Sequence, residues 1–331
     1  MWFKEISDDS DVVISTRVRF ARSIDGYKFP HMLSEKELND VISKVESSIN
    51  KKKYNLLRMK DIDDINRMSL VEKHLISKEF EDNINGAIVI NKDNTIVTMI
   101  NEEDHLRIQS FGSGFKMDDC YKRLTDFTDQ LNEKIDFSIS EKYGYITSCP
   151  TNVGSAMRVS VMIHLPALSK MGLLNKLLDQ ASSLGFSVRG YYGENTVGGG
   201  NIYQISNQKT LGISDEDIIY NTKTIVTSII EQERKAREIL KRSNMYLEDS
   251  VYRAYGILKN ARIISDEEAL KLLSEVRLGV SIKLINETNL ETIQRLMVDT
   301  KENTLKTILK ENFSKEEENI KRAEYIRKEF D

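Results

Sequence analysis

Three acidic side chains stand in a row between two apolar stretches, in the segment INEEDHLRIQ at residues 100–109. On a solvated turn, the common setting for such a cluster, Glu102, Glu103 and Asp104 would have no chemical role. Beside a bound substrate, one of these carboxylates could accept a proton or hold a cation. A second candidate acid, Glu194, begins the glycine-rich segment GENTVGGGN. That segment fits either a loop that covers a substrate or a plain hairpin connection.

Five arginines lie in or beside apolar, alternating segments. Each one alone would be an ordinary surface arginine, with its stem packed and its head in water. Together they suggest a triphosphate clamp, because the guanidinium fork matches phosphate oxygens and stays charged at any working pH. The five are Arg17, Arg19, Arg107, Arg158 and Arg189.

The usual nucleotide-binding and metal-binding signatures are missing. The segment FGSGFK is neither a Walker A loop nor a dinucleotide fingerprint, and the protein-kinase motifs are absent. The four histidines lack metal-ligand spacing, so we expect no metal held by protein side chains. Cys149, before Pro150 at the expected end of a strand, is either a small buried hydrophobe or a partly ionised site residue.

Composition narrows the class of protein. The 331 residues suit one large domain or two modest ones, and the net charge of −4 gives no global basic field for nucleic acid. No apolar run approaches the roughly 18 residues of a membrane helix, and the first residues lack a signal-peptide core. Two cysteines are too few for a disulfide framework, so we expect a cytoplasmic protein without a membrane partner.

The elements that must position these residues mix strands and helices up to about residue 245. Alternation predicts strands at 11–20, 105–111, 143–148, 157–165, 186–192 and 201–207, and a hairpin at 86–100. Capping pairs and helical spacing predict helices at 34–49, 116–135 and from Ser214 toward Lys241. After residue 245 no convincing alternation remains. We therefore expect one domain at 1–245 and an all-helical domain at 246–331.

Taken together, these segments resemble the catalytic domain of the guanidino (phosphagen) kinases, and specifically the bacterial protein-arginine kinases. The matching segments are STRVRFARS, LVEKHLIS, NEEDHLRIQ, TSCPTNVGSAMRVSVMIHLPAL and RGYYGENTVGGGNIYQISNQKTLG. In the tail, YGILKNARIIS and LSEVRLG extend the likeness. The resemblance implies an α+β fold, in which helices flank a largely antiparallel, glutamine-synthetase-like sheet and an all-helical C-terminal domain follows.

The resemblance also implies roles for single residues. Glu103 matches a catalytic carboxylate, Glu194 its partner on a mobile loop, and Cys149 a cysteine beside the guanidinium. The five arginines match the phosphate clamp, and His74 a histidine near adenine. ATP and Mg²⁺ are the implied cofactors, with Mg²⁺ bound through phosphates and water.

Two departures from the family pattern affect these expectations. The mobile loop often has a second acid after the first, and ENTVGGG has none. The C-terminal pattern Arg-Asp-x-x-Arg-Ala, which resembles an allosteric phosphoarginine patch, here has Glu318 and Asn319 at its first two positions. Arg322 is the remaining candidate for a phosphoarginine contact, and a solvated helical arginine is the alternative.

The implied function is ATP-dependent phosphorylation of arginines in proteins. Implied partners are protein substrates, including a heat-shock repressor and misfolded proteins, a zinc-binding activator, a Clp-type chaperone-protease and another copy of the chain. A kinase for a small guanidino metabolite and a non-catalytic nucleotide-binding scaffold are the alternatives. We expect a protein substrate because the STRVR strand begins near Asp11, without the preceding helical domain that helps to enclose a metabolite.

Overall fold

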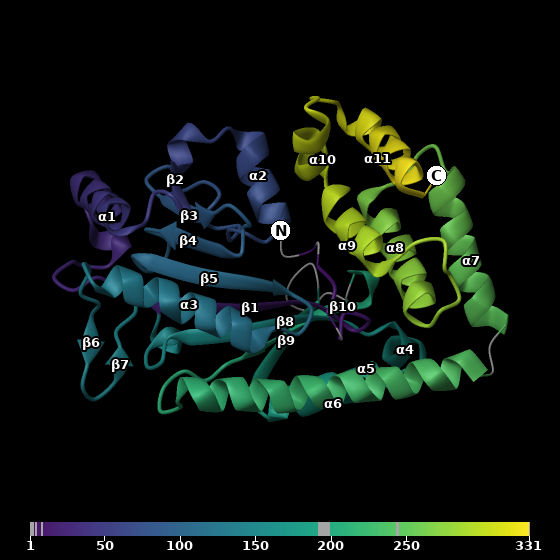
Figure 1. Ribbon diagram of the computed structural model, residues 1–331, viewed down its shortest axis with the longest axis horizontal. Coiled ribbons are helices and arrows are strands. Elements are labelled where there is room, and N and C mark those ends of the chain that lie inside the picture. Colours follow the sequence, from purple (N-terminus) through teal and green to yellow (C-terminus); the bar gives the residue numbers. More distant parts are fainter. Residues whose placement is uncertain (1–2, 4, 8, 191–198, 243–244, 331) are drawn as a thin grey trace.

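A computed structural model describes the chain except for residues 1–2, 4, 8, 191–198, 243–244 and 331. Its centre is an eight-stranded antiparallel sheet in the order β2-β3-β4-β5-β1-β8-β10-β9 (Figure 1). These strands are β1 (Val13–Arg22), β2 (Tyr54–Arg58), β3 (Ala87–Asn91), β4 (Ile96–Ile100), β5 (Leu106–Ser113), β8 (Met157–His164), β9 (Phe186–Gly190) and β10 (Ile202–Asn207). The expected antiparallel α+β fold is confirmed.

The two faces of the sheet differ because side chains alternate along each strand. On β1, Val18 and Phe20 belong to a large apolar core, whereas Arg17 and Arg19 point to the opposite face. The core side is covered by α3 (Met117–Asn132) and α6 (Asp215–Arg242), which contribute Leu124, Phe127, Val226 and Ile230. The arginine-bearing face is therefore left to form a site.

Smaller elements surround the sheet. Helix α1 (Glu35–Ser48) begins with the expected capping box, in which Ser34 and Glu37 exchange hydrogen bonds. Helices α2 (Asp64–Glu72), α4 (Pro166–Lys170) and α5 (Leu174–Ser183), like strand β2, were not among the sequence expectations. Short 3₁₀ turns are η1 (Pro30–Met32), η2 (Met59–Asp61), η3 (Pro150–Asn152) and η4 (Gly199–Asn201).

The strand expected at residues 143–148 is wrong in length. Only β7 (Gly144–Tyr145) forms there, paired with β6 (Ile139–Ser140). Gly144 has a φ of 78°, and a Cβ at this position would lie 2.6 Å from the carbonyl oxygen of Gly154. This close backbone approach bends the chain away from a regular strand.

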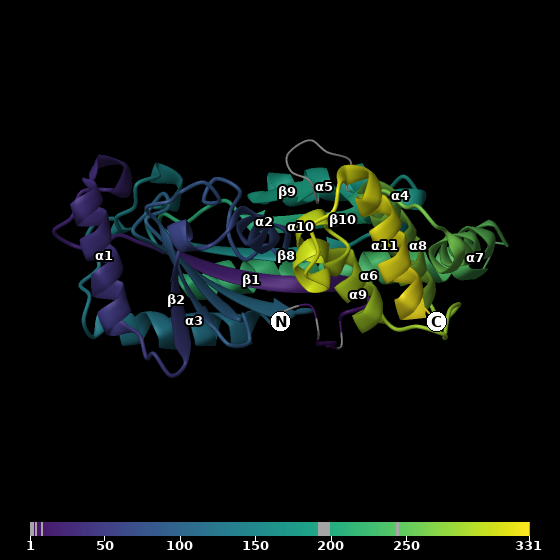
Figure 2. The ribbon, with the colours of Figure 1, turned by 90° about the horizontal axis from the view of Figure 1, so that it is seen from above.

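The C-terminal part is helical, as expected, and packs against one end of the sheet (Figure 2). Apolar side chains of the sheet, such as Ile14, Phe111 and Ile202, share a core with Leu273 and Leu296. The two regions are therefore joined by a continuous core. The helices are α7 (Met245–Asn260), α8 (Asp266–Ser281), α9 (Leu290–Asp299), α10 (Glu302–Leu309) and α11 (Lys315–Phe330).

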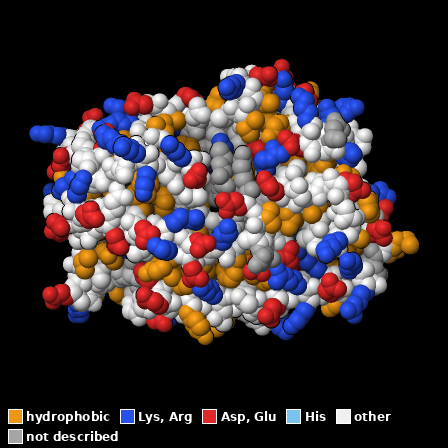
Figure 3. All heavy atoms as spheres, viewed as in Figure 1, with side chains coloured by type: hydrophobic (Ala, Val, Ile, Leu, Met, Phe, Trp, Pro, Cys, Tyr) orange, Lys and Arg blue, Asp and Glu red, His pale blue; other side chains and the backbone are white. Residues whose placement is uncertain are grey.

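Acidic and basic side chains are interspersed over the face shown in Figure 3. Such a mixture agrees with the small net charge of −4. Within the described residues, the structure holds no helix that is both long and apolar enough to span a membrane.

Candidate active site

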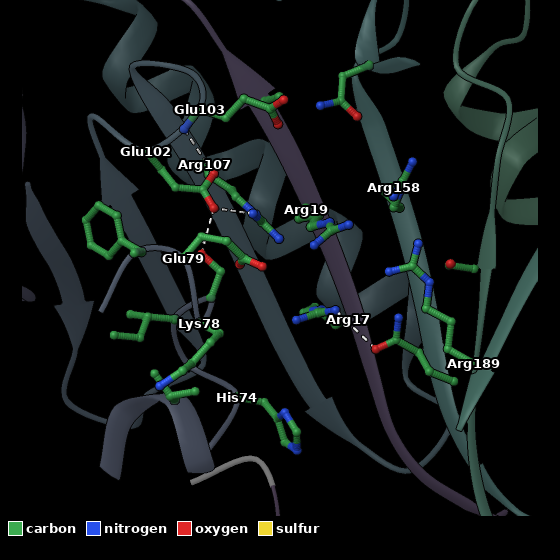
Figure 4. Close-up of a pocket in the computed structure, with 18 of the residues that line it drawn as sticks. Arg17, Arg19, His74, Lys78, Glu79, Glu102, Glu103, Arg107, Arg158 and Arg189 are labelled. Carbon is green, nitrogen blue, oxygen red and sulfur yellow. Dashed lines mark hydrogen bonds and ion pairs between the residues drawn. The ribbon is translucent and has the colours of Figure 1, made fainter. Parts of the chain in front are cut away.

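A cleft of about 1180 Å³ lies on the arginine-bearing face of the sheet (Figure 4). That volume exceeds the roughly 300–1,000 Å³ of an ordinary small-molecule pocket, so a nucleotide and an acceptor side chain fit together. The cleft unites residues that are far apart in the sequence. Its lining includes Arg17, Arg19, His74, Glu103, Arg107, Cys149, Arg158 and Arg189.

Strand register explains why the arginines meet. Arg19 on β1 is directly opposite Arg158 on β8, and Arg17 is opposite Ser160. On the next strand pair, Arg189 of β9 is opposite Gln204 of β10. Each of these residues points to the same face, because antiparallel partners in register share their orientation.

Neutral side chains orient Arg17. Its Nε donates to Ser160 Oγ at 3.2 Å, and a terminal nitrogen donates to Gln204 Oε1 at 3.3 Å. These acceptors fix the guanidinium without neutralising its charge. Sequence patterns gave no role to Gln204, although its signal is a polar residue within the alternating strand expected at residues 201–207.

The positive charges of the arginines lie close together in the cleft and lower the pKa of several of these side chains. Burial, followed by the charges of Arg107 and Arg158, lowers the pKa of Arg17 to about 9. Burial and the neighbouring arginines also lower the pKa of Arg19 and that of Arg158. Cations that destabilise one another in this way favour an anionic ligand between them.

The three acids of the cluster, Glu102, Glu103 and Asp104, differ in their hydrogen bonds and in their burial. Glu102 Oε1 accepts from Arg107 at 2.5 Å and from Ser77 Oγ at 2.6 Å. Asp104 is buried, and its Oδ1 accepts from Ser23 Oγ at 3.0 Å and from the backbone N–H of Ser148 at 2.6 Å. Burial raises the pKa of Asp104.

All three acids line the cleft, and Glu103 differs from its two neighbours because it is exposed. The hydrogen bonds of Asp104 fasten this turn to the loop that leads into Cys149. Glu102 and Asp104 therefore fix the turn, and Glu103 is the acid of this cluster that is most open to a ligand.

His74 also lines the cleft, and its backbone is left-handed with a φ of 57°. Burial, followed by the charges of Arg17 and Lys301, lowers the pKa of His74 to about 4. The ring is therefore neutral near pH 7. Figure 4 shows His74 and Glu103 at opposite ends of the labelled residues, with Arg17 and Arg19 between them.

Cys149 is half-buried on the cleft wall, with its Sγ 3.0 Å from Thr151 Oγ1. Its expected place at a strand end is wrong, because β7 stops at Tyr145 and Cys149 instead precedes the turn η3. The thiol nevertheless shares the cleft with Glu103 and Arg158.

Two expected site residues are not part of this described cleft. Glu194 lies outside the described residues. Arg322 is fully buried in α11 and donates to the carbonyls of Thr300 and Ile264, to Asn319 Oδ1 and to Glu318. The alternative prediction, that Arg322 is a solvated helical arginine, is therefore wrong. The burial of Arg322 favours a structural role over a ligand contact.

No group of three His, Cys, Asp or Glu side chains among the described residues is arranged to hold a metal ion.

Comparison with known proteins identifies the family. Residues 35–236 match the ATP:guanido phosphotransferase C-terminal catalytic domain, and residues 244–331 match the protein-arginine kinase McsB C-terminal domain. The protein-arginine kinase of Clostridium acetobutylicum is 43% identical over 98% of this chain and 98% of that protein. The corresponding Bacillus subtilis kinase is 39% identical over 98% of this chain and 92% of that protein.

A solved structure supports the same assignment. The duplicated taurocyamine kinase of Schistosoma mansoni, with bound transition-state analogue components, is 28% identical with a TM-score of 0.62. The match covers 70% of this chain and spans about a third, 34%, of that duplicated protein. This chain belongs to the ATP:guanido phosphotransferase family and, within it, to the protein-arginine kinases.

Proposed function

We propose that this chain is an ATP-dependent protein-arginine kinase, which transfers the γ-phosphoryl group of ATP to a guanidinium nitrogen of an arginine in a protein. The observation that carries the proposal is the single cleft in which five arginines and the exposed Glu103 meet. Whole-length similarity to protein-arginine kinases supports the protein substrate over a small guanidino metabolite.

The arginines Arg17, Arg19, Arg107, Arg158 and Arg189 bind the triphosphate. Their forked donors offset the charge on the phosphoryl oxygens in the transition state. Phosphoryl transfer depends chiefly on such positioning and charge stabilisation. Mg²⁺ supplies further charge neutralisation when it is bound through the phosphates, since the described cleft offers no carboxylate cage.

Glu103 acts on the acceptor. A guanidinium has a pKa above about 12 and is a poor nucleophile until a proton leaves. Glu103 pairs with its N–H edge, aligns one nitrogen with the γ-phosphorus and takes up the proton. The N–P bond then forms as the bond from phosphorus to the β,γ-bridging oxygen breaks, and ADP leaves.

Cys149 and Glu194 complete the acceptor site in this proposal. Cys149 lies on the same cleft wall and helps to place the guanidinium, without accepting the phosphoryl group. Glu194 serves as the second carboxylate, an assignment that rests on the sequence motif RGYYGE.

We further infer the cellular setting from the family resemblance. Residues 1–245 form the catalytic domain, and residues 246–331 form a domain for substrate binding and regulation. The enzyme acts in the cytoplasm on a heat-shock repressor and on misfolded proteins, and its products are delivered to a Clp-type chaperone-protease. A zinc-binding activator and self-association belong to the same proposal.

Labelled ATP tests the proposed activity. The chain is incubated with γ-labelled ATP and Mg²⁺ together with either an unfolded protein or free arginine. We expect label on the protein that is released by acid, because an N–P bond is acid-labile and a phosphoserine is not. Turnover of free arginine without labelled protein would favour the metabolite kinase, and nucleotide binding without any transfer would favour the scaffold.

A further inference from the structure

The C-terminal helices form part of the catalytic cleft. Asp266, the first residue of α8, and Lys301, which caps the start of α10, both line it together with His74 and Arg17. Residues 246–331 therefore contribute a wall to the cleft.

Asp266 and Lys301 form a close ion pair in which the two partners differ in accessibility. Lys301 Nζ lies 2.9 Å and 2.8 Å from the two carboxylate oxygens of Asp266. The Lys301 side chain is 9% exposed, whereas the Asp266 side chain is 37% exposed. A ligand in the cleft thus reaches the carboxylate, and Lys301 holds that carboxylate in place from behind.

The wall is anchored firmly to the sheet region through α2. Glu72 accepts hydrogen bonds from the backbone N–H groups of Asn303 and Thr304 at 3.0 Å and 2.7 Å. Glu72 is the last residue of α2, and His74 follows two positions later. The start of α10, Lys301 included, is therefore tied to the segment that carries His74.

The position of Asp266 and Lys301 near His74 determines which part of ATP they can contact. In the proposed function, the γ-phosphoryl group lies at the Glu103 end and the phosphates lie among the arginines. Since His74 lies at the opposite end from Glu103, the nucleoside extends toward His74 (Figure 4). A carboxylate repels phosphates but is a common acceptor for ribose hydroxyls.

We propose that Asp266, held by Lys301, accepts hydrogen bonds from the ribose hydroxyls of ATP, so that the C-terminal helices complete the nucleoside end of the site. Asp266 binds substrate, and Lys301 is a positioning residue. Each carboxylate oxygen has two acceptor positions, so Asp266 can bind Lys301 and a hydroxyl together. The inference rests on the proposed function because it takes the arginine cleft to be the triphosphate site.

Binding of three probes to the full-length chain tests the inference. These are ATP, 2′,3′-dideoxy-ATP and inorganic tripolyphosphate, titrated by calorimetry with Mg²⁺ present. The native chain should bind ATP roughly tenfold more tightly than the dideoxy nucleotide. Asp266→Ala should remove that preference and leave tripolyphosphate affinity within about twofold of native.

Two further variants control for the loss of an ion pair as such and for unfolding. Glu302→Ala removes the partner of Lys306 in a comparable ion pair of 2.7 Å on α10, outside the cleft lining, and should change none of the three affinities. If Asp266→Ala unfolds because it removes the carboxylate that contacts Lys301, the double variant Asp266→Ala, Lys301→Met removes both charges and should give the same loss of preference.

A native chain that binds ATP and its dideoxy analogue equally, or an Asp266 variant that keeps the preference, overturns the ribose assignment. Equal weakening of ATP and tripolyphosphate by Asp266→Ala overturns it as well, because the residue would then act at the phosphates. Failure of the proposed function has a different signature. In that case Arg158→Ala would leave tripolyphosphate affinity unchanged.

Discussion

Two groups of arginines have opposite roles in this molecule: the junction group, Arg237 and Arg277, is buried, and the cleft group, Arg17 and Arg19, is half-buried. Where the C-terminal helices meet the sheet, fixed acceptors surround each guanidinium. Arg277 donates to the carbonyls of Asp11 and Ser10 at 2.8 Å and 2.6 Å and lies 3.2 Å from His164 Nδ1. Arg237 donates to Glu233 Oε1 at 2.8 Å. Like charges meet in both places, since burial and the charge of Arg237 also lower the pKa of Arg277 to about 9. The acceptors differ: in the cleft, Arg17 lies beside further arginines and donates to the neutral side chains of Ser160 and Gln204.

The difference teaches that surroundings, and not residue type, decide what an arginine of the interior or of a cleft does. A guanidinium whose donors meet fixed carbonyls and carboxylates stabilises the fold. A guanidinium that lies next to like charges and meets only neutral side-chain acceptors destabilises the fold slightly, and a bound anion removes that cost. Cleft arginines should therefore matter for function and little for stability, and the junction arginines should show the reverse.

The largest expected effect is that of Arg19→Ala. Turnover should fall roughly a thousandfold, because this guanidinium would stabilise charge on the transferred phosphoryl group. Thermal stability should stay the same or rise, since the mutation removes a cation from a crowded site. Steady-state kinetics and calorimetry on one preparation measure both effects, and a large loss of stability would place Arg19 with the junction arginines.

Glu103→Gln should reduce turnover about a hundredfold, the usual scale for a positioned acid–base group, and leave ATP affinity nearly intact. Glu102→Gln is the matched control, because Glu102 pairs with Arg107 and should weaken nucleotide binding as well. Retention of more than half the native turnover by Glu103→Gln would show that this carboxylate is not the base.

Arg277→Met should lower the free energy of unfolding by about 2 kcal/mol, because it leaves buried carbonyls without their donor. The Michaelis constant for ATP in the folded enzyme should change little. Denaturant titration measures the first quantity and initial rates the second. A stable variant with a raised constant for ATP would contradict the division between the two groups.

The smallest expected effect is that of pH: the free energy of unfolding should decrease when the solution is acidified. His105 is buried, burial lowers its pKa to about 4, and its Nδ1 accepts from the backbone N–H of Ile24. Its ordinary pKa is about 6.5, so the unfolded chain binds this proton at a higher pH than the folded chain. Stability is therefore lost as the pH falls from about 6.5 toward 4.

The measured loss should be about 1 kcal/mol per such histidine between pH 7 and pH 5.5. His164 contributes in the same direction, because burial and the charges of Arg277 and Arg237 lower its pKa. Denaturant titrations at the two pH values test this, and equal stability at both would show that these rings are protonated in the folded chain.

Alternation was enough to predict the arginine face, because side chains on a strand change sides at every residue. Arg17, Arg19 and Arg158 therefore lie where the sequence indicated. The hairpin β3–β4 and the capped helix α1 were also predicted, since their signals are local.

Contacts between distant segments could not be predicted in the same way. Asp104 is a structural acid because Ser23 and Ser148, remote in sequence, donate to it. Arg322 is buried because α11 packs its charged side chain against the carbonyls of Thr300 and Ile264. A helix with this many charged residues gives no sequence signal for such burial.

Thermal unfolding with and without inorganic tripolyphosphate tests the central claim most directly, for the native chain, Arg158→Ala and Arg277→Met. The native chain should gain several degrees in Tm on adding the anion at about a hundred times its Kd. Arg158→Ala should begin at the native Tm or above it and gain little. Arg277→Met should begin lower and gain as much as the native chain. An anion-induced gain that persists in Arg158→Ala and disappears in Arg277→Met would contradict the account.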